Sequence, residues 1–298
     1  TYEGVVFSSD TTVLISVATP LMGSYTIPST VTRVCSFAGC TRLTAIVIPE
    51  SVVTIDDDAF ADCSALTSIT TNNGIDLRNS GLYFTKDSIK YKVLAKNSVQ
   101  VAQKTYTGGV VIPATVTAGN TFTITGIASG AFMNCSGLTS VTIPNGVTTI
   151  GGRAFMNCGN LNPISIPNGV MSIGDSAFYG CSRPTSLTIP GSVESVGASS
   201  FEGCSGLKSV IIIDGTSEIG NKAFYNCGNL QTVVIPSSVT TIGDNAFYGC
   251  QNATIYCEAE TIPAGWSSGW NPYASSNPPV CNAIAEGNFV FRPSSDGT

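Results

Sequence analysis

The stretch AFMNCSGLTSVTIPNGVTTIGGR, which runs from Ala131 to Arg153, decides the fold. Its pattern recurs with a period of 23 residues as far as Cys250. The period is marked by a column of phenylalanines: Phe132, Phe155, Phe178, Phe201, Phe224 and Phe247. A cysteine follows each of them three residues later: Cys135, Cys158, Cys181, Cys204, Cys227 and Cys250. Self-similarity at a fixed period of this length is the sequence signature of a solenoid.

Each unit contains one short strand and a second apolar segment, around Val147 and Ile150, that also faces the interior. Leu138, Val141 and Ile143 reproduce the L-x-x-L-x-L core of a leucine-rich repeat, in a strand whose alternate side chains point inward. Pro144 ends this strand because proline has no N–H for the ladder. The segment around Phe132 has room for barely one helical or 3₁₀ turn. We therefore expect a β-rich fold with little helix.

A single unit cannot be stable alone. Its few apolar side chains bury too little surface to offset the entropy lost on ordering the whole unit. Neighbouring units must therefore stack, covering both faces of every turn and completing the hydrogen bonds between strands.

The phrase AFxxCxxLTSVTIPxxVTxIG resembles the BspA-type leucine-rich repeat of surface and secreted proteins from host-associated bacteria. The resemblance covers about two thirds of the chain, and it includes the period, the cysteine column and the Ile-Pro step. It implies a solenoid in the form of a right-handed superhelix, with β caps and an internal β insertion. It also implies a protein that is secreted or held at the bacterial surface and that adheres to a host or extracellular macromolecule.

The expected organisation is one continuous solenoid made of five parts. These are an N-terminal β cap (1–36), two repeat units (37–71), a β-rich insertion (72–130), the main repeat array (131–257) and an aromatic and proline-rich C-terminal cap (258–298). Within the cap, residues 4–7 and 13–17 predict a hairpin. In the insertion, alternating runs predict strands at 82–84, 89–94, 98–101, 110–113 and 121–124. The insertion also holds several lysines and is read either as a solvated hairpin or as a binding protrusion.

The composition limits the possible partners. Charged residues are only 11% of the 298 residues, and the net charge is −6, so nucleic acid and anionic membranes are poor partners. No apolar run approaches the 18 residues of a membrane-spanning helix. We expect a monomer.

Most of the eleven cysteines lie at one position of the repeat. Eight lie in the repeat column, which adds Cys40 and Cys63 to the six above. Because they recur inside an apolar pattern, we expect buried, unpaired thiols that behave as small hydrophobes. The spacing of neighbouring strands leaves a disulfide between adjacent units open. Cys257 and Cys281 lie outside the column and are open to pairing with each other.

The sequence offers no catalytic or cofactor-binding constellation. It contains no histidine, no Cys-x-x-Cys and no phosphate-binding glycine loop, so we expect no enzyme activity, no cofactor and no metal site. Asp56, Asp57 and Asp58 form the one dense acidic cluster, which a solvated turn explains better than a calcium site. A polysaccharide-cleaving enzyme would need paired carboxylates on one strand face, and the outward strand positions here are mostly hydroxyls.

A long scaffold without catalytic groups favours recognition of a macromolecule, and the resemblance implies that this partner is a host matrix protein or a glycan. The candidate binding residues are the outward column of the strand face: Thr142, Ser165, Thr188, Ile211 and Val234. The alternative is a carbohydrate-binding module whose aromatic platform is made by Trp266, Trp270 and Tyr273. These three aromatics are also consistent with a cap that covers the last repeat. The residue after each column phenylalanine, such as Tyr225 or Tyr248, is read as packing or as a half-exposed contact ridge.

Overall fold

The fold was analysed in a computed structural model that describes residues 4–18, 21–71, 74–273, 278–281, 284–286 and 289–291. The chain forms two compact units, and we describe each by itself. The first unit contains Thr1–Ala102 and Pro113–Thr125, and the second contains Gln103–Ile112 and Gly126–Thr298. The chain thus passes between the units inside the segment 72–130, which the sequence marks as an insertion. The described residues contain strands and turns but no helix, as the short repeat predicts.

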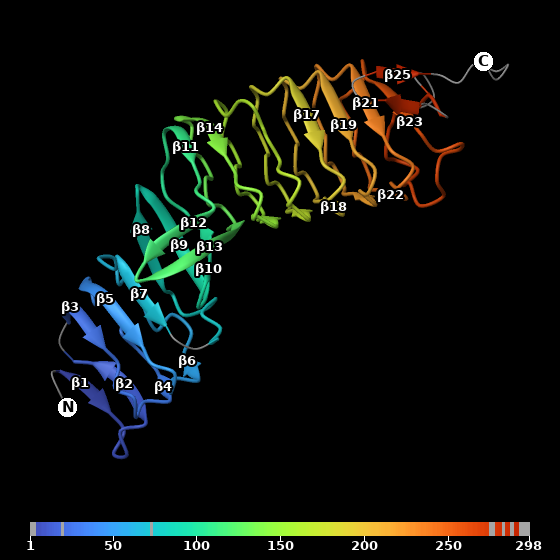
Figure 1. Ribbon diagram of the computed structural model, residues 1–298. Coiled ribbons are helices and arrows are strands. Elements are labelled where there is room, and N and C mark those ends of the chain that lie inside the picture. The colour runs from blue at the N-terminus through green and yellow to red at the C-terminus, as the bar shows by residue number, and fades with distance from the viewer. Residues whose placement is uncertain are drawn as a thin grey trace. The chain divides into compact units, whose positions relative to one another are not determined.

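The second unit is a β-solenoid with two ladders of parallel strands (Figure 1). We call the first ladder the strand wall. Its strands are β11 (Gly108–Val111), β14 (Leu138–Thr142), β17 (Ser186–Ile189), β19 (Ser209–Ile212), β21 (Thr232–Ile235) and β23 (Thr254–Cys257). β11 pairs with β14, and β17, β19, β21 and β23 form a separate sheet. Ser186 pairs with Ser209 and Ser209 with Thr232, so neighbouring strands are one repeat apart.

We call the second ladder the back wall. It begins with the last two residues of β13 (Asn120–Ile127) and continues through strands of two residues each: β15 (Thr149–Ile150), β16 (Ser172–Ile173), β18 (Ser195–Val196), β20 (Glu218–Ile219) and β22 (Thr241–Ile242). These strands are the second apolar edge of each repeat. Their register is unbroken, because each isoleucine or valine pairs with the one a repeat later.

The core between the walls is built from the phenylalanine column. The rings of Phe132, Phe155 and Phe178 stack with centroids 4.8 and 5.0 Å apart and planes within 8° of parallel. Backbone hydrogen bonds also join these turns, as from the Phe155 N–H to the Ala177 oxygen at 2.7 Å. All the column phenylalanines of this unit are buried. The inward face predicted from the repeat is therefore confirmed.

The cysteine column is buried and unpaired, as predicted. The structure also explains why a cysteine occupies this position of the repeat. The Cys158 Sγ donates to the backbone oxygen of Phe132 at 3.0 Å, and Cys181 donates to Phe155 at 3.2 Å. Cys63, Cys204, Cys227 and Cys250 repeat this bond. Each of these thiols therefore supplies a donor to a buried carbonyl of the preceding turn while filling the space of a small apolar side chain.

The first unit combines a short solenoid with an antiparallel sheet. The predicted N-terminal hairpin is present as β1 (Val5–Phe7) and β2 (Val13–Val17), continued in parallel by β4 (Arg33–Val34) and β6 (Thr54–Ile55). A second parallel sheet contains β3 (Met22–Thr26), β5 (Arg42–Ile48) and β7 (Ser68–Thr71). The insertion contributes β8 (Tyr83–Lys86), β9 (Ile89–Ala95), β10 (Ser98–Val101) and β12 (Thr115–Ala118), which pairs with β13. The sequence did not predict β12.

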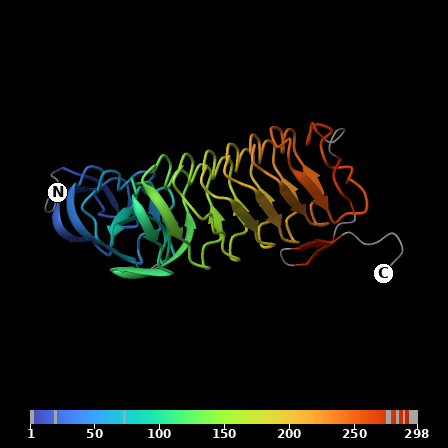
Figure 2. The same cartoon turned by 90° about the horizontal axis from the view of Figure 1, so that it is seen from above.

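The end of the second unit carries one irregular turn and a hairpin. The N–H groups of Asn245 and Phe247 donate to the oxygens of Gly269 and Trp270, so residues around Trp270 replace a further regular repeat. Hairpin β24 (Ile284–Glu286) and β25 (Phe289–Phe291) follows. Figure 1 labels β25 near the C-terminal end of the unit, and Figure 2 shows the same turns from above. No membrane-crossing helix is found in the part of the chain that the structure describes.

Candidate functional site

The candidate site is the outward face of the strand wall in the second unit. Thr142, Ser165 and Thr188 are exposed there, as expected from the alternation of the strand. Ile211 is half-buried. The expectation for Val234 is wrong, because its side chain is only 3% exposed. Bulky side chains explain this: Val234 is paired in register with Ile211 on one side and Tyr256 on the other. We therefore remove Val234 from the candidate surface.

The strand wall is interrupted at one repeat. Residues 161–167 align with β14 one repeat earlier but form no strand. Asn162 donates its N–H to the Thr139 oxygen at 3.0 Å, and the pairing stops there. Pro163 stands where β14 has Ser140, so the next N–H of the ladder is missing. In the following repeat Pro184 stands where leucine normally leads into the strand. The two prolines thus flank the break.

The break leaves β17 unpaired along the edge that faces the preceding repeat. Ser209 donates to the Thr185 oxygen and Ile213 to the Ile189 oxygen, so these backbone groups of β17 face β19. Because groups alternate along a strand, those of Ser186 and Thr188 face the other way, toward Ile164 and Ile166. Among the described residues, no hydrogen bond joins these two segments. Both segments therefore present backbone N–H and C=O groups to the space between them.

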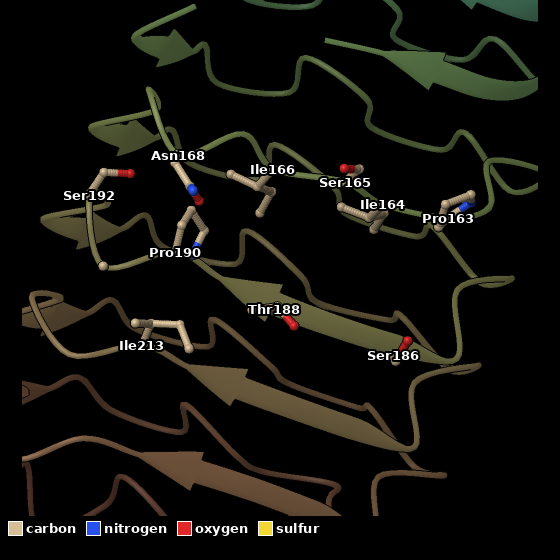
Figure 3. A pocket seen from close by; sticks show the side chains of 11 residues that line it. Pro163, Ile164, Ser165, Ile166, Asn168, Ser186, Thr188, Pro190, Ser192 and Ile213 are labelled. Atoms are coloured by element: carbon tan, nitrogen blue, oxygen red, sulfur yellow. The ribbon is translucent and has the colours of Figure 1, made fainter. Parts of the chain in front are cut away.

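A groove of about 540 Å³ lies at the break (Figure 3). Ser165 and Ile166 line it from the strandless segment, and Ser186 and Thr188 line it from β17. Ile213 closes one end and is 45% exposed. Ile164 and Ile166 at the break are 6% and 8% exposed, so both side chains are still buried.

The chemistry of the groove is that of a contact surface. Every lining side chain is aliphatic, proline, hydroxyl or amide, and none carries a charge. Such a surface can make hydrogen bonds and apolar contacts, but its lining has no titratable side chain that could act as acid or base, or activate a hydroxyl as nucleophile. The groove and the exposed hydroxyls beside it can therefore bind, and they give no support for catalysis.

The tryptophans of the C-terminal segment do not form an exposed platform. Trp266 and Trp270 are 7% and 4% exposed and meet edge to face at 4.8 Å. Trp270 also contacts the ring of Phe247 edge-on, and the Trp266 Nε1 donates to the Val239 oxygen at 3.1 Å. Only Tyr273 of this trio is partly accessible. The two indoles therefore cover the end of the phenylalanine column, and a sugar has no open indole face to stack on.

The acidic cluster of the first unit is divided among different partners. Asp56 forms an ion pair with Arg33, with 2.9 Å between Oδ1 and Nε, and this hydrogen bond lowers the pKa of Asp56. Asp57 and Asp58 border a separate polar hollow of about 270 Å³ that Arg78 and other residues also line. No group of three potential metal ligands is found among the described residues. The three carboxylates do not converge, so the solvated-turn interpretation is the better one.

The sequence did not single out the residues that matter most at the break. The available signal was the comparison of LNPISIP with LTSVTIP, which places a proline at a hydrogen-bonding position of the strand.

Known proteins share this repeat. A family profile described as BspA type leucine rich repeat region matches residues 19–117 and 125–254. The chain belongs to this family. No curated protein sequence matches the chain. Among solved structures, a leucine rich cell surface protein from Faecalibacterium prausnitzii A2-165 is 27% identical, with a TM-score of 0.51; the match covers 72% of this chain and 59% of that one.

A second similar solved structure is that of the leucine rich repeat protein of T. pallidum. It is 24% identical with a TM-score of 0.55, and the match covers 67% of this chain and 99% of that one. At this identity the likeness shows the fold alone. Our chain spans about three fifths of the length of the F. prausnitzii structure. The family and both structures thus agree on a leucine-rich-repeat solenoid.

Proposed function

We propose that this protein is a non-catalytic recognition module, secreted or held at the cell surface, that binds an extracellular macromolecule through the strand wall. The observation that carries the proposal is the uncharged groove at the break, where β17 offers an unpaired edge. The relative from F. prausnitzii is described as a cell surface protein, which supports the same location for this chain.

A protein partner fits the groove better than a glycan. An extended polypeptide can add hydrogen bonds to an open strand edge, and its alternate side chains can enter neighbouring pockets. The groove supplies both features, since Ser186 and Thr188 present backbone groups and Ile166 and Ile213 present apolar surface. Glycan recognition commonly uses exposed aromatic faces, and the two indoles here are buried. A host matrix protein with an extended segment is therefore the favoured partner class.

The experiment is a binding screen of the purified chain against immobilised matrix proteins and a glycan array. The test variant carries Thr142→Lys, Ser165→Lys and Thr188→Lys, three exposed positions on the strand wall. The matched control carries Thr148→Lys, Met171→Lys and Glu194→Lys, exposed positions at the back wall in the same repeats. We expect the strand-wall variant to bind at least about tenfold more weakly, because three buried charges oppose contact.

Equal affinity of the strand-wall variant and the wild type contradicts the proposal. A third variant, Tyr273→Ala, tests the C-terminal segment. If Tyr273→Ala alone abolishes binding, and the bound probe is a glycan, the carbohydrate-binding alternative replaces ours.

A further inference from the structure

Two cysteines outside the repeat column lie beside each other at the end of the strand wall. Cys257 is the last residue of β23, and Cys281 follows Val280. The Val280 N–H donates to the Ile255 oxygen and the Cys257 N–H donates to the Val280 oxygen, both at 2.8 Å. Tyr256 and Val280 accordingly form a parallel bridge. Cys257 and Cys281 are thus the next two residues along the same parallel pair.

This placement suits a disulfide. Paired strands are about 4.8 Å apart, and the Cα atoms of bonded cysteines are usually about 4.4–6.8 Å apart. Burial first, and then the neighbouring Cys281 thiol, raise the pKa of Cys257 to about 12, so Cys257 is the less reactive of the two thiols. The structure pairs neither cysteine with another.

Access separates this pair from the cysteine column. The column thiols are buried, and most of them donate to a carbonyl of the preceding repeat, as Cys250 does to the Phe224 oxygen at 3.2 Å. Cys257 is buried too, at 1% exposure, but Cys281 is half-buried and can be reached from solvent. An oxidant in solution therefore has one thiol to react with at this place, with a second thiol beside it.

We propose that Cys257 and Cys281 form a disulfide that fastens the C-terminal segment to the last strand of the wall. The oxidant is a small disulfide such as oxidised glutathione. The Cys281 sulfur, as thiolate, attacks it and releases one glutathione thiolate. The Cys257 sulfur then attacks the mixed disulfide and releases the second. The two cysteine protons pass to the two leaving thiolates, so two thiols are oxidised and one external disulfide is reduced.

The bond closes the chain between β23 and Cys281 into a loop. A cross-link of this kind limits the freedom of the unfolded chain and keeps the end of the solenoid together. Disulfides persist in oxidising surroundings outside the cytoplasm. The proposed surface location supplies such surroundings, although the disulfide rests on the geometry of the two cysteines alone.

The test oxidises the native full chain with oxidised glutathione, blocks remaining thiols with iodoacetamide in denaturant and counts them by mass spectrometry. We expect two of the eleven thiols to be lost, with no glutathione retained. A glutamate-specific protease cuts after Glu258 and Glu260 and separates the two cysteines in the chain. The fragments should remain linked until a reductant is added.

Two single variants make the result specific. Cys281→Ser should abolish the linked fragments, whereas Cys35→Ser, which removes the other half-buried thiol, should leave them unchanged. Eleven free thiols after oxidation, a stable glutathione adduct, or a link between two column cysteines would each overturn the proposal. Circular dichroism of Cys281→Ser checks that the variant is folded, so that a missing link reports the missing thiol.

Discussion

The phenylalanine column shows how one side chain supports several repeats at once. Phe178 is 1% exposed and stacks between Phe155 at 5.0 Å and Phe201 at 5.2 Å. Each ring fills its own turn and also covers the faces of the turns before and after it. Stability in a solenoid depends on such contacts between neighbouring repeats. A change at one column position therefore weakens two interfaces.

We predict that Phe178→Ala lowers the free energy of unfolding by about 3–5 kcal/mol, because it removes a buried aromatic ring and leaves a cavity. Ser186→Ala lies on the exposed side of the next strand and should change it by less than about 0.5 kcal/mol. Urea unfolding followed by circular dichroism measures both. Equal midpoints for the two variants would show that the inward and outward faces are assigned wrongly.

The cysteine column makes stability depend on alkaline pH. Burial raises the pKa of Cys63, Cys158 and Cys204 to about 12 each, from an ordinary value near 9. Between these values the unfolded chain loses thiol protons that the folded chain retains. The column's contribution is therefore complete below pH about 9 and is lost as the pH rises toward about 12. Each thiol contributes at most about 1.4 kcal/mol per pH unit to this loss.

Cys158→Ala should accordingly show a shallower loss of stability between pH 9 and 10.5 than the wild type, with reductant present throughout. The measurement is the urea midpoint at pH 7.5, 9 and 10.5. Ser182→Ala, an exposed change in the following repeat, should follow the wild type at every pH. Parallel curves for Cys158→Ala and the wild type would mean that the column thiol does not carry this pH dependence.

At the level of elements, most strands could be predicted from the repeat, because spacing alone sets which side chains face inward. The same holds for the antiparallel strands β8, β9 and β10, whose alternation is visible in the sequence. β12 was not predicted, although Gly119-Asn120 at its junction with β13 is a dipeptide typical of a tight hairpin turn. The burial of Val234 was not predicted, because alternation gives the direction of a side chain but does not show which neighbouring side chains cover it.

The break in the strand wall could be predicted only from the backbone N–H that Pro163 lacks. Pro163 keeps the apolar pattern of the repeat intact, so periodicity shows nothing unusual. What it takes away is an N–H that the regular repeats use, as where Thr232 donates to the Lys208 oxygen at 3.1 Å. The missing hydrogen bond follows from the chemistry of proline, and the spacing of apolar residues does not reveal it.

We predict that the double variant Pro163→Ser and Pro184→Leu, which restores the regular repeat, extends the sheet across the break. The amide of Thr188 should then exchange with solvent at least about tenfold more slowly, because it gains a backbone partner. Pro144→Ala, a proline change after the regular strand β14, serves as the control and should leave Thr188 unchanged. If exchange at Thr188 is already slow in the wild type, the edge of β17 is not open.

In the second unit as a whole, the residues that stabilise the fold and the residues available for binding occupy different positions of the repeat. The same phenylalanine, cysteine and aliphatic columns support every turn, while the outward strand positions are free to differ. Extended faces of solenoids bind in this way, through many small contacts instead of one deep pocket. The uncharged hydroxyl surface beside the groove suits contact with a large partner. At the break, backbone groups of β17 and of the strandless segment are available as well.

The central claim is that a partner binds the strand wall at the break, and hydrogen exchange of the free and bound chain tests it most directly. The probe is the matrix protein that binds most tightly in the screen. We predict that saturation with it slows exchange at Ile164, Ile166, Ser186 and Thr188 by at least about tenfold, while β16 and β18 of the back wall are unchanged. Protection confined to the back wall or to the C-terminal segment, with no change at these four amides, would contradict the claim.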